Sequence, residues 1–141
     1  MLGVLERGAL ASTVLRVDEP ETFYERVGGE PFFEALVGRF YDGVAADPLL
    51  RPLYPEDLGA SAHHLALFLA QYWGGPRTYS DTRGHPRLRM RHAPFVIGPA
   101  ERDAWLSHMR SAVRAAGIPP AEEAELWAYL EMAAQSLTNA P

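Results

Sequence analysis

Proline and glycine divide this chain into segments whose apolar residues recur every three or four positions. Proline disrupts a helix interior but fits its first turn, while glycine fits the residue that follows the last turn. The breaks that bound the segments are Pro20, Gly28–Gly29, Pro31, Pro48, Gly74–Gly75–Pro76, Pro99, Gly117 and Pro119–Pro120. The pattern predicts an all-α fold of helices joined by short turns.

Four segments are long enough for substantial helices, and two predict short ones, over residues 20–27 and 90–92. The apolar stripes of the long helices are Phe33, Leu36, Val37, Phe40 and Val44; Leu65, Phe68, Leu69 and Tyr72; Trp105, Met109, Ala112 and Ala116; and Leu126, Leu130, Ala133 and Leu137. Each follows the spacing of a helix that buries one face. Residues 76–89 are rich in turn-forming residues, so we expect a long and therefore functional loop there.

The length of 141 residues suits one domain, expected over residues 20–141, after an N-terminal extension over residues 1–19. A net charge of −5 argues against nucleic acid as the main partner, because phosphate binding needs a basic face. The lack of cysteine excludes disulfides, zinc thiolates and iron–sulfur clusters. No apolar run reaches the roughly 18 residues that span a bilayer. Charges in Met1–Arg7 argue against a secretion signal, so we expect a cytoplasmic protein.

His92 ends a short basic segment that is closed by Pro94. Neutral imidazole is a strong iron ligand, and an apolar Met90 and Phe95 beside it suit packing against a porphyrin. Arg91 could then meet a haem propionate. A histidine in such a segment is also compatible with a surface or core position. The arginines between residues 77 and 91 are likewise compatible with either a solvated basic loop or an anionic ligand.

Three aromatic hydrogen-bond donors, Tyr41, Tyr54 and Trp105, come from three different predicted elements. They can pack in the core, or they can converge on a small polar ligand. Adjacent His63 and His64 point about 100° apart on a helix and cannot easily serve one site. His108 falls on the predicted exposed side of its helix. Motifs of zinc proteases, dinucleotide-binding folds, phosphate-binding loops and serine hydrolases are absent from the sequence.

From about Phe23 onward the chain resembles the truncated haemoglobins, specifically their group II (O-type) branch. The strings that carry the resemblance are Phe23–Gly29 (FYERVGG), Arg39–Tyr41 (RFY), Leu53–Asp57 (LYPED), Gln71–Ser80 (QYWGGPRTYS), Arg83–Phe95 (RGHPRLRMRHAPF), Glu101–Leu106 (ERDAWL) and Tyr129–Ala134 (YLEMAA). The central run, from Gln71 to Phe95, is the longest and most specific part.

The resemblance implies a two-on-two helical sandwich around haem b, with His92 as the proximal iron ligand. It places Tyr41, Tyr54 and Trp105 around the bound ligand. Ser61 would face the iron, Leu65 would wall the pocket one turn later, and His64 would lie near a propionate. The full set of implied haem contacts is Tyr41, Tyr54, Ser61, His64, Leu65, Phe68, Met90, Arg91, His92, Phe95 and Trp105.

Such a protein would bind O2 and release it slowly, because hydrogen bonds to a charged acceptor are worth roughly 1.5–3 kcal/mol. CO, NO and peroxide are further expected ligands, and any turnover would need a separate reductase. One alternative is a haem enzyme for nitric oxide dioxygenation or peroxide reduction. Another is a helical module without haem, against which His92, Tyr41 and Trp105 argue. A monomer and a homodimer are both compatible with the sequence.

Overall fold

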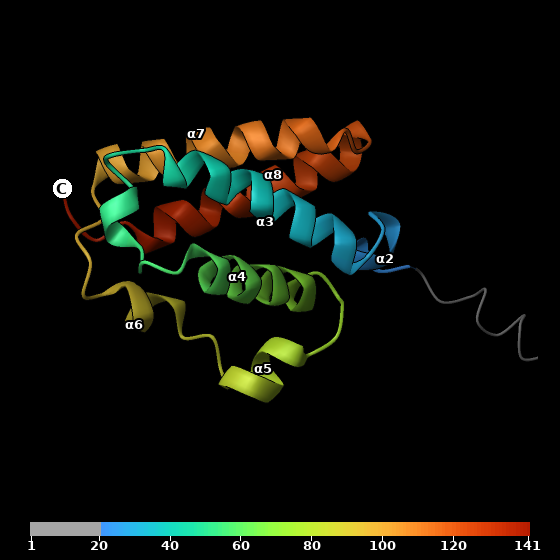
Figure 1. Cartoon of the computed structure of the whole chain (residues 1–141). Helices are drawn as coiled ribbons and strands as arrows, with labels where there is room; N and C mark the ends of the chain where they lie inside the picture. The colour runs from blue at the N-terminus through green and yellow to red at the C-terminus, as the bar shows by residue number, and fades with distance from the viewer. Residues whose placement is uncertain (1–20) are drawn as a thin grey trace, which may run out of the picture.

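A computed structural model describes residues 21–141, so Pro20 and the extension expected over residues 1–19 lie outside the described residues. Between residues 21 and 141 the structure has seven α-helices, one 3-10 turn and no strand, which confirms the all-α prediction (Figure 1). The α-helices are α2 (Phe23–Arg26), α3 (Glu30–Ala45), α4 (Leu58–Tyr72), α5 (Thr78–Arg83), α6 (Leu88–His92), α7 (Pro99–Ala116) and α8 (Pro120–Leu137); the 3-10 turn is η1 (Arg51–Leu53).

The four long helices form two layers, as the two-on-two sandwich requires. Helix α3 contacts both α4 and α7, and α7 contacts α8 (Figure 1). The pair α3–α4 therefore packs against the pair α7–α8. Of the short helices, α5 contacts α4 and α6 contacts α8, so both lie along one edge of the sandwich.

The core fills the space between α3, α7 and α8, and the predicted stripes supply it. Phe33, Phe40, Met109 and Leu126 are all fully buried. Burying each such side chain contributes about 1.5–3 kcal/mol relative to exposure. On α4 the stripe is less uniform, because Leu69 is buried whereas Tyr72 is 51% exposed.

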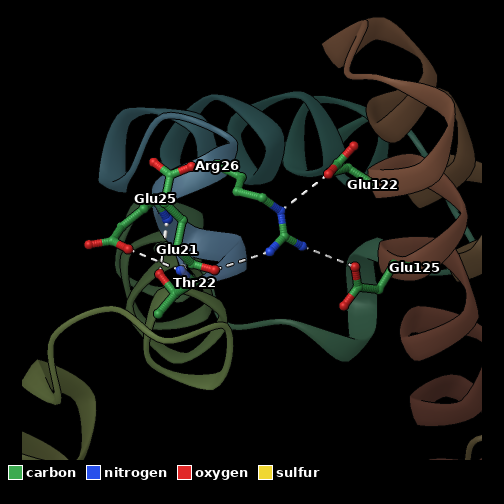
Figure 2. A network of polar contacts seen from close by, with 6 residues as sticks. All are labelled: Glu21, Thr22, Glu25, Arg26, Glu122 and Glu125. Carbon is green, nitrogen blue, oxygen red and sulfur yellow. Dashed lines mark hydrogen bonds and ion pairs between the residues drawn. The ribbon is translucent and has the colours of Figure 1, made fainter. Parts of the chain in front are cut away.

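Polar contacts fix α2 against the start of α8. Thr22 and Glu25 form a capping box, in which each side chain accepts a hydrogen bond from the other residue's backbone N–H. Figure 2 shows the guanidinium of Arg26 between the carboxylates of Glu122 and Glu125, at 3.2 and 3.3 Å. Exposed ion pairs contribute little stability. We therefore interpret the network as setting the position of α2.

The prediction of a loop over residues 76–89 was wrong at Thr78–Arg83, which forms α5, and at Leu88 and Arg89, where α6 begins. The side chain of Gln71 binds Ser80 twice, donating to its hydroxyl at 2.7 Å and accepting from its backbone N–H at 2.9 Å. Tyr79 is buried, with its ring centroid 5.6 Å from that of Phe68. These contacts with α4 stabilise α5, a helix that its own polar sequence does not predict.

Candidate functional site

A cavity of about 380 Å³ lies between the η1 turn, the first turn of α4, the α5–α6 edge and one end of α7 and α8. Cavities of this size accommodate small molecules and cofactors. Its lining is largely apolar, with a few polar groups. The lining residues are Leu50, Leu53, Tyr54, Pro55, Ser61, Arg83, Arg91, His92, Phe95, Ile97, Glu101, Arg102, Trp105, Ala133, Ala134 and Leu137.

His92 lines the cavity from the last turn of α6 and is half-buried. Its Nδ1 lies 2.7 Å from the carbonyl oxygen of Leu88. Because a carbonyl only accepts hydrogen bonds, Nδ1 must carry the proton, which leaves the Nε2 lone pair available to a metal. A backbone carbonyl commonly orients a metal-binding imidazole in this way. The arrangement suits His92 as an iron ligand.

Residues 21–141 contain no group of three or more His, Cys, Asp or Glu side chains that could hold a metal ion. Within the described residues, His92 is the one histidine that lines the cavity, and it belongs to no such group. Haem iron takes four nitrogen ligands from its porphyrin and needs only an axial ligand from the protein. The single imidazole of His92 in a largely apolar cavity fits this requirement.

Aromatic donors gather on another wall of the cavity. Tyr54 and Trp105 line it, and the ring of Tyr41 packs edge-on against Tyr54 at 5.5 Å. Phe40 packs against Trp105 at 5.3 Å and so holds the indole from behind. Burial raises the pKa of Tyr54 to about 12, although a hydrogen bond with Trp105 opposes the shift. Burial also raises the pKa of Tyr41. Both hydroxyls remain protonated near neutral pH and can donate.

Residues 22–139 match the family model of the bacterial-like globins. Group 2 truncated hemoglobin YjbI of Bacillus subtilis is 42% identical over 116 residues, which cover 82% of this chain and 87% of the relative. A thermostable hemoglobin from Thermobifida fusca is 61% identical with a TM-score of 0.84, covering 86% of this chain and 99% of that one. A truncated oxygen-avid haemoglobin from B. subtilis is 41% identical with a TM-score of 0.80, covering 84% and 100%.

The chain belongs to the group II truncated haemoglobins. Membership makes it a haem globin, with iron in its cofactor and O2 as its ligand. The single imidazole in the lining of the cavity is consistent with that cofactor. Within residues 21–141 of this truncated haemoglobin, no helix is both long and apolar enough to cross a membrane.

Not every residue expected at the haem of this truncated haemoglobin lines the cavity. Ser61, Arg91 and Phe95 line it with Tyr54, Trp105 and His92. The side chains that do not are Tyr41, His64, Leu65, Phe68 and Met90. Of these, Tyr41, Leu65 and Phe68 pack in or against the core, whereas Met90 is 63% exposed.

His64 lies beside the cavity rather than in its lining. Arg83 places Nη1 3.3 Å from His64 Nε2. Burial lowers the pKa of His64, and the charge of Arg83 lowers it further. The imidazole is therefore neutral near pH 7. Arg83, the cationic neighbour of His64, lines the cavity itself.

The expectation that His108 is exposed was wrong. Its side chain is 28% exposed, and its Nε2 lies 2.7 Å from Asp47 Oδ2. A Cβ atom at position 43 would lie 2.5 Å from the His108 ring. Gly43, which has no side chain, therefore leaves space for the histidine. Asp47 Oδ1 also accepts a hydrogen bond from the N–H of Leu49 at 2.9 Å. The hydrogen bond from His108 lowers the pKa of Asp47. The pair anchors the turn that leads to Tyr54.

Asn139 is a structural contributor that the sequence does not reveal. Its Oδ1 accepts from the N–H of Ile97 at 2.8 Å, and its Nδ2 donates to the carbonyl of Phe95 at 2.8 Å. A longer contact of 3.4 Å joins Nδ2 to the carbonyl of His92. Asn139 thereby holds the connection between α6 and α7 from the end of α8. Its partners are more than forty residues away in sequence, so no local pattern points to it.

Proposed function

We propose that this truncated haemoglobin holds haem b in the cavity through His92, its single protein ligand to iron, and that it releases O2 slowly. The observation that carries the proposal is the pairing of a histidine oriented by the Leu88 carbonyl with protonated aromatic donors around one apolar cavity. Haem, when bound, supplies reversible coordination of O2.

His92 supports this function through its fixed tautomer. The hydrogen bond to the Leu88 carbonyl orients the ring and raises the basicity of Nε2. Since Leu88 and His92 share one helix, the orientation is set locally. Phe95 and Ile97 provide apolar walls beside the ligand atom.

Tyr54 and Trp105 would donate hydrogen bonds to O2, with Tyr41 able to join them. A hydrogen bond to a charged acceptor is worth roughly 1.5–3 kcal/mol, which corresponds to slowing release about 10-fold or more. The resemblance to an oxygen-avid haemoglobin of B. subtilis supports slow release. Ser61 and Leu65, on α4, are proposed to shape the space for the ligand, while Phe68 backs it from the core.

Arg83 and Arg91 are proposed to meet the haem propionates, because both line the cavity and carry permanent positive charges. His64 would join them as a neutral donor through Nδ1, since its Nε2 faces the guanidinium of Arg83. Phe95 would pack on the porphyrin. Met90, exposed on α6, would reach the porphyrin only if its side chain turned inward.

A second candidate function is a haem enzyme for nitric oxide dioxygenation or peroxide reduction, with CO as an inhibitory ligand and with an external reductase. The observation that favours it is an aromatic cluster that reaches the surface. Tyr72 stacks on Tyr129 with centroids 4.1 Å apart, and it is 51% exposed. Such a side chain could carry oxidising equivalents outward. Turnover assays with nitric oxide and peroxide, each with a supplied reductant, distinguish the enzyme from a carrier.

Three expectations remain predictions from the sequence. They are a globin domain over residues 20–141 after an extension, a cytoplasmic location, and assembly as a monomer or homodimer.

The test of the main proposal is the absorption spectrum of the purified, reduced protein with and without O2 and CO. We expect a Soret band that shifts with each ligand. His92→Ala should abolish this band, whereas His63→Ala, at an exposed position on α4, is the matched control and should retain it. An unchanged haem spectrum in His92→Ala would refute the assignment of the iron ligand.

A further inference from the structure

The segment from Arg77 to Arg91 carries a charge opposite to that of the chain as a whole. Its five arginines and one acidic residue, Asp81, give the segment a formal charge of +4. Since the whole chain has a net charge of −5, the remaining residues together carry −9. The arginines are Arg77, Arg83, Arg87, Arg89 and Arg91. An acidic protein with one basic segment presents a localised electrostatic site to acidic partners.

The haem cavity accounts for only two of these arginines. Arg83 and Arg91 line it, and Arg91 is further held by a 2.8 Å hydrogen bond from Nε to the carbonyl of Pro86. Arg87 and Arg89 are exposed and lie outside the lining. Neither takes part in the ion pairs found within residues 21–141. Their charges are therefore directed to solvent in the described part of the chain.

The backbone holds Arg87 in an unusual conformation. With φ of 50°, it is the only non-glycine residue between 21 and 141 with a positive φ. Such a conformation is costly for a residue with a Cβ. The N–H of Arg87 donates to Nδ1 of His85 at 3.1 Å, and its carbonyl accepts from the N–H of Arg91 at 3.0 Å. Arg87 is thus fixed at the start of α6.

Exposed apolar side chains accompany these charges. Met90 is 63% exposed and Val96 is 69% exposed. Met90 follows Arg87 by three positions, so the two are neighbours on the helix surface. We use the name α6 surface for four exposed residues on α6 and on the segments at its two ends: Arg87, Arg89, Met90 and Val96. Figure 1 shows α6 at the edge of the helical sandwich, where a partner can approach it.

We propose that the α6 surface docks an acidic electron-donor protein that reduces the ferric iron. The inference rests on the proposed haem site, because His92 lies on the same short helix as Arg89 and Met90. A donor seated on α6 would approach the edge of the cavity. One electron would pass from the donor's redox centre to the ferric iron, giving the ferrous state that binds O2.

The size and composition of the α6 surface favour a redox partner over a permanent subunit. Redox encounters bury less than about 1,200 Å² in total, whereas permanent interfaces are larger and more apolar. Two exposed apolar residues within an arginine-rich segment suit a brief encounter. Complementary charge would raise the association rate, and salt would reduce it.

The probe is an acidic plant-type [2Fe–2S] ferredoxin, a low-potential one-electron donor. Stopped-flow spectroscopy of the ferric holoprotein measures its second-order reduction rate at low and high salt. Arg87→Glu/Arg89→Glu should slow reduction by about 10-fold or more at low salt and flatten the salt dependence. Arg87→Gln/Arg89→Gln should give an intermediate rate. The matched control, Arg110→Glu/Arg114→Glu on α7, makes the same charge change far from α6 and should behave as wild type.

Two further measurements isolate docking from haem chemistry. Reduction by photoreduced deazariboflavin, a small neutral donor, should proceed at the wild-type rate in every variant. Calorimetric titration with oxidised ferredoxin should show weaker binding to Arg87→Glu/Arg89→Glu, independently of electron transfer. Equal ferredoxin rates and affinities in the wild type and this variant would overturn the proposal. So would equal losses in the α7 control, which would indicate a general charge effect. Failure of the haem site itself would be distinct, because the ferric spectrum would then be missing from the wild type.

Discussion

The core between α3, α7 and α8 and the α5–α6 edge of the cavity are built on different principles. In the core, Phe33, Phe40 and Met109 are fully buried and make no polar contacts. Helix α6 has no buried residue and is held by hydrogen bonds such as that from Arg91 to the Pro86 carbonyl. Both regions belong to the same chain, but only the first has a hydrophobic interior of its own.

The difference indicates how stability and function are divided. Apolar burial scales with the area removed from water and is non-directional, so the core forms whatever the cavity contains. The α5–α6 edge has one buried side chain, Tyr79, depends otherwise on a few directional bonds, and borders the cavity. We therefore expect core substitutions to change folding, and edge substitutions to change cofactor and ligand retention.

The largest expected effect comes from Phe40→Ala in the core. Replacing a buried phenylalanine by alanine lowers the free energy of unfolding by roughly 3–5 kcal/mol, because a cavity remains. Phe95→Ala, which removes the same group at the 42% exposed edge position, should change stability by about 0.5 kcal/mol. Urea unfolding of the haem-free protein, followed by circular dichroism, measures both. Similar losses of unfolding free energy in the two variants would contradict the distinction between core and edge.

The next effect concerns Trp105, which connects the two regions by packing on Phe40 and lining the cavity. Trp105→Phe should speed O2 release about 10-fold or more, because it removes a donor worth roughly 1.5–3 kcal/mol. Trp127→Phe, on α8 and outside the cavity lining, is the matched control. Stopped-flow release rates that equal those of wild type would exclude the indole as a donor to the ligand.

A smaller effect is expected at Asn139, which holds the connection after α6. Asn139→Ala should raise the rate of haem loss about fivefold, since a hydrogen bond contributes about 1 kcal/mol net. Asn139→Asp keeps the acceptor for the Ile97 N–H but loses the donor to the Phe95 carbonyl, so its rate should be intermediate. Haem transfer to an excess of an acceptor globin measures the rate. A large drop in unfolding free energy with unchanged haem loss would place Asn139 with the core.

The smallest effect is a pH dependence at His64. Its folded pKa lies below the ordinary value of 6.5, first because of burial and then because of Arg83. As pH falls through 6.5, the unfolded chain takes up this proton before the folded chain does, so stability decreases. Above that pH the contribution of His64 to the pH dependence of stability vanishes. Melting temperatures between pH 8 and pH 5 should therefore fall less steeply in His64→Gln than in wild type. Parallel curves of melting temperature against pH in the two proteins would show that folding does not lower the pKa of His64.

Helical periodicity and the proline and glycine breaks were sufficient to predict α3, α4, α7 and α8, and the stripe from Phe33 to Val44 is buried as predicted. These features are encoded within single helical turns, so they can be read locally. The same holds for the short helix that ends at His92. The resemblance in residues 71–95 also predicted the family that the comparisons show.

The sequence by itself therefore determined the four long helices, their apolar faces and His92 as a candidate ligand. Only the tertiary structure decided the hydrogen bonds that join distant segments. Helix α5 depends on Gln71 bound to Ser80, the turn before Tyr54 depends on an Asp47–His108 pair 61 residues apart, and the α6–α7 connection depends on Asn139. Each bond forms only where folding brings its partners within about 3 Å. The helical periodicity of the sequence predicts each helix by itself. It does not encode which residues of different helices come close, because that depends on how the helices pack.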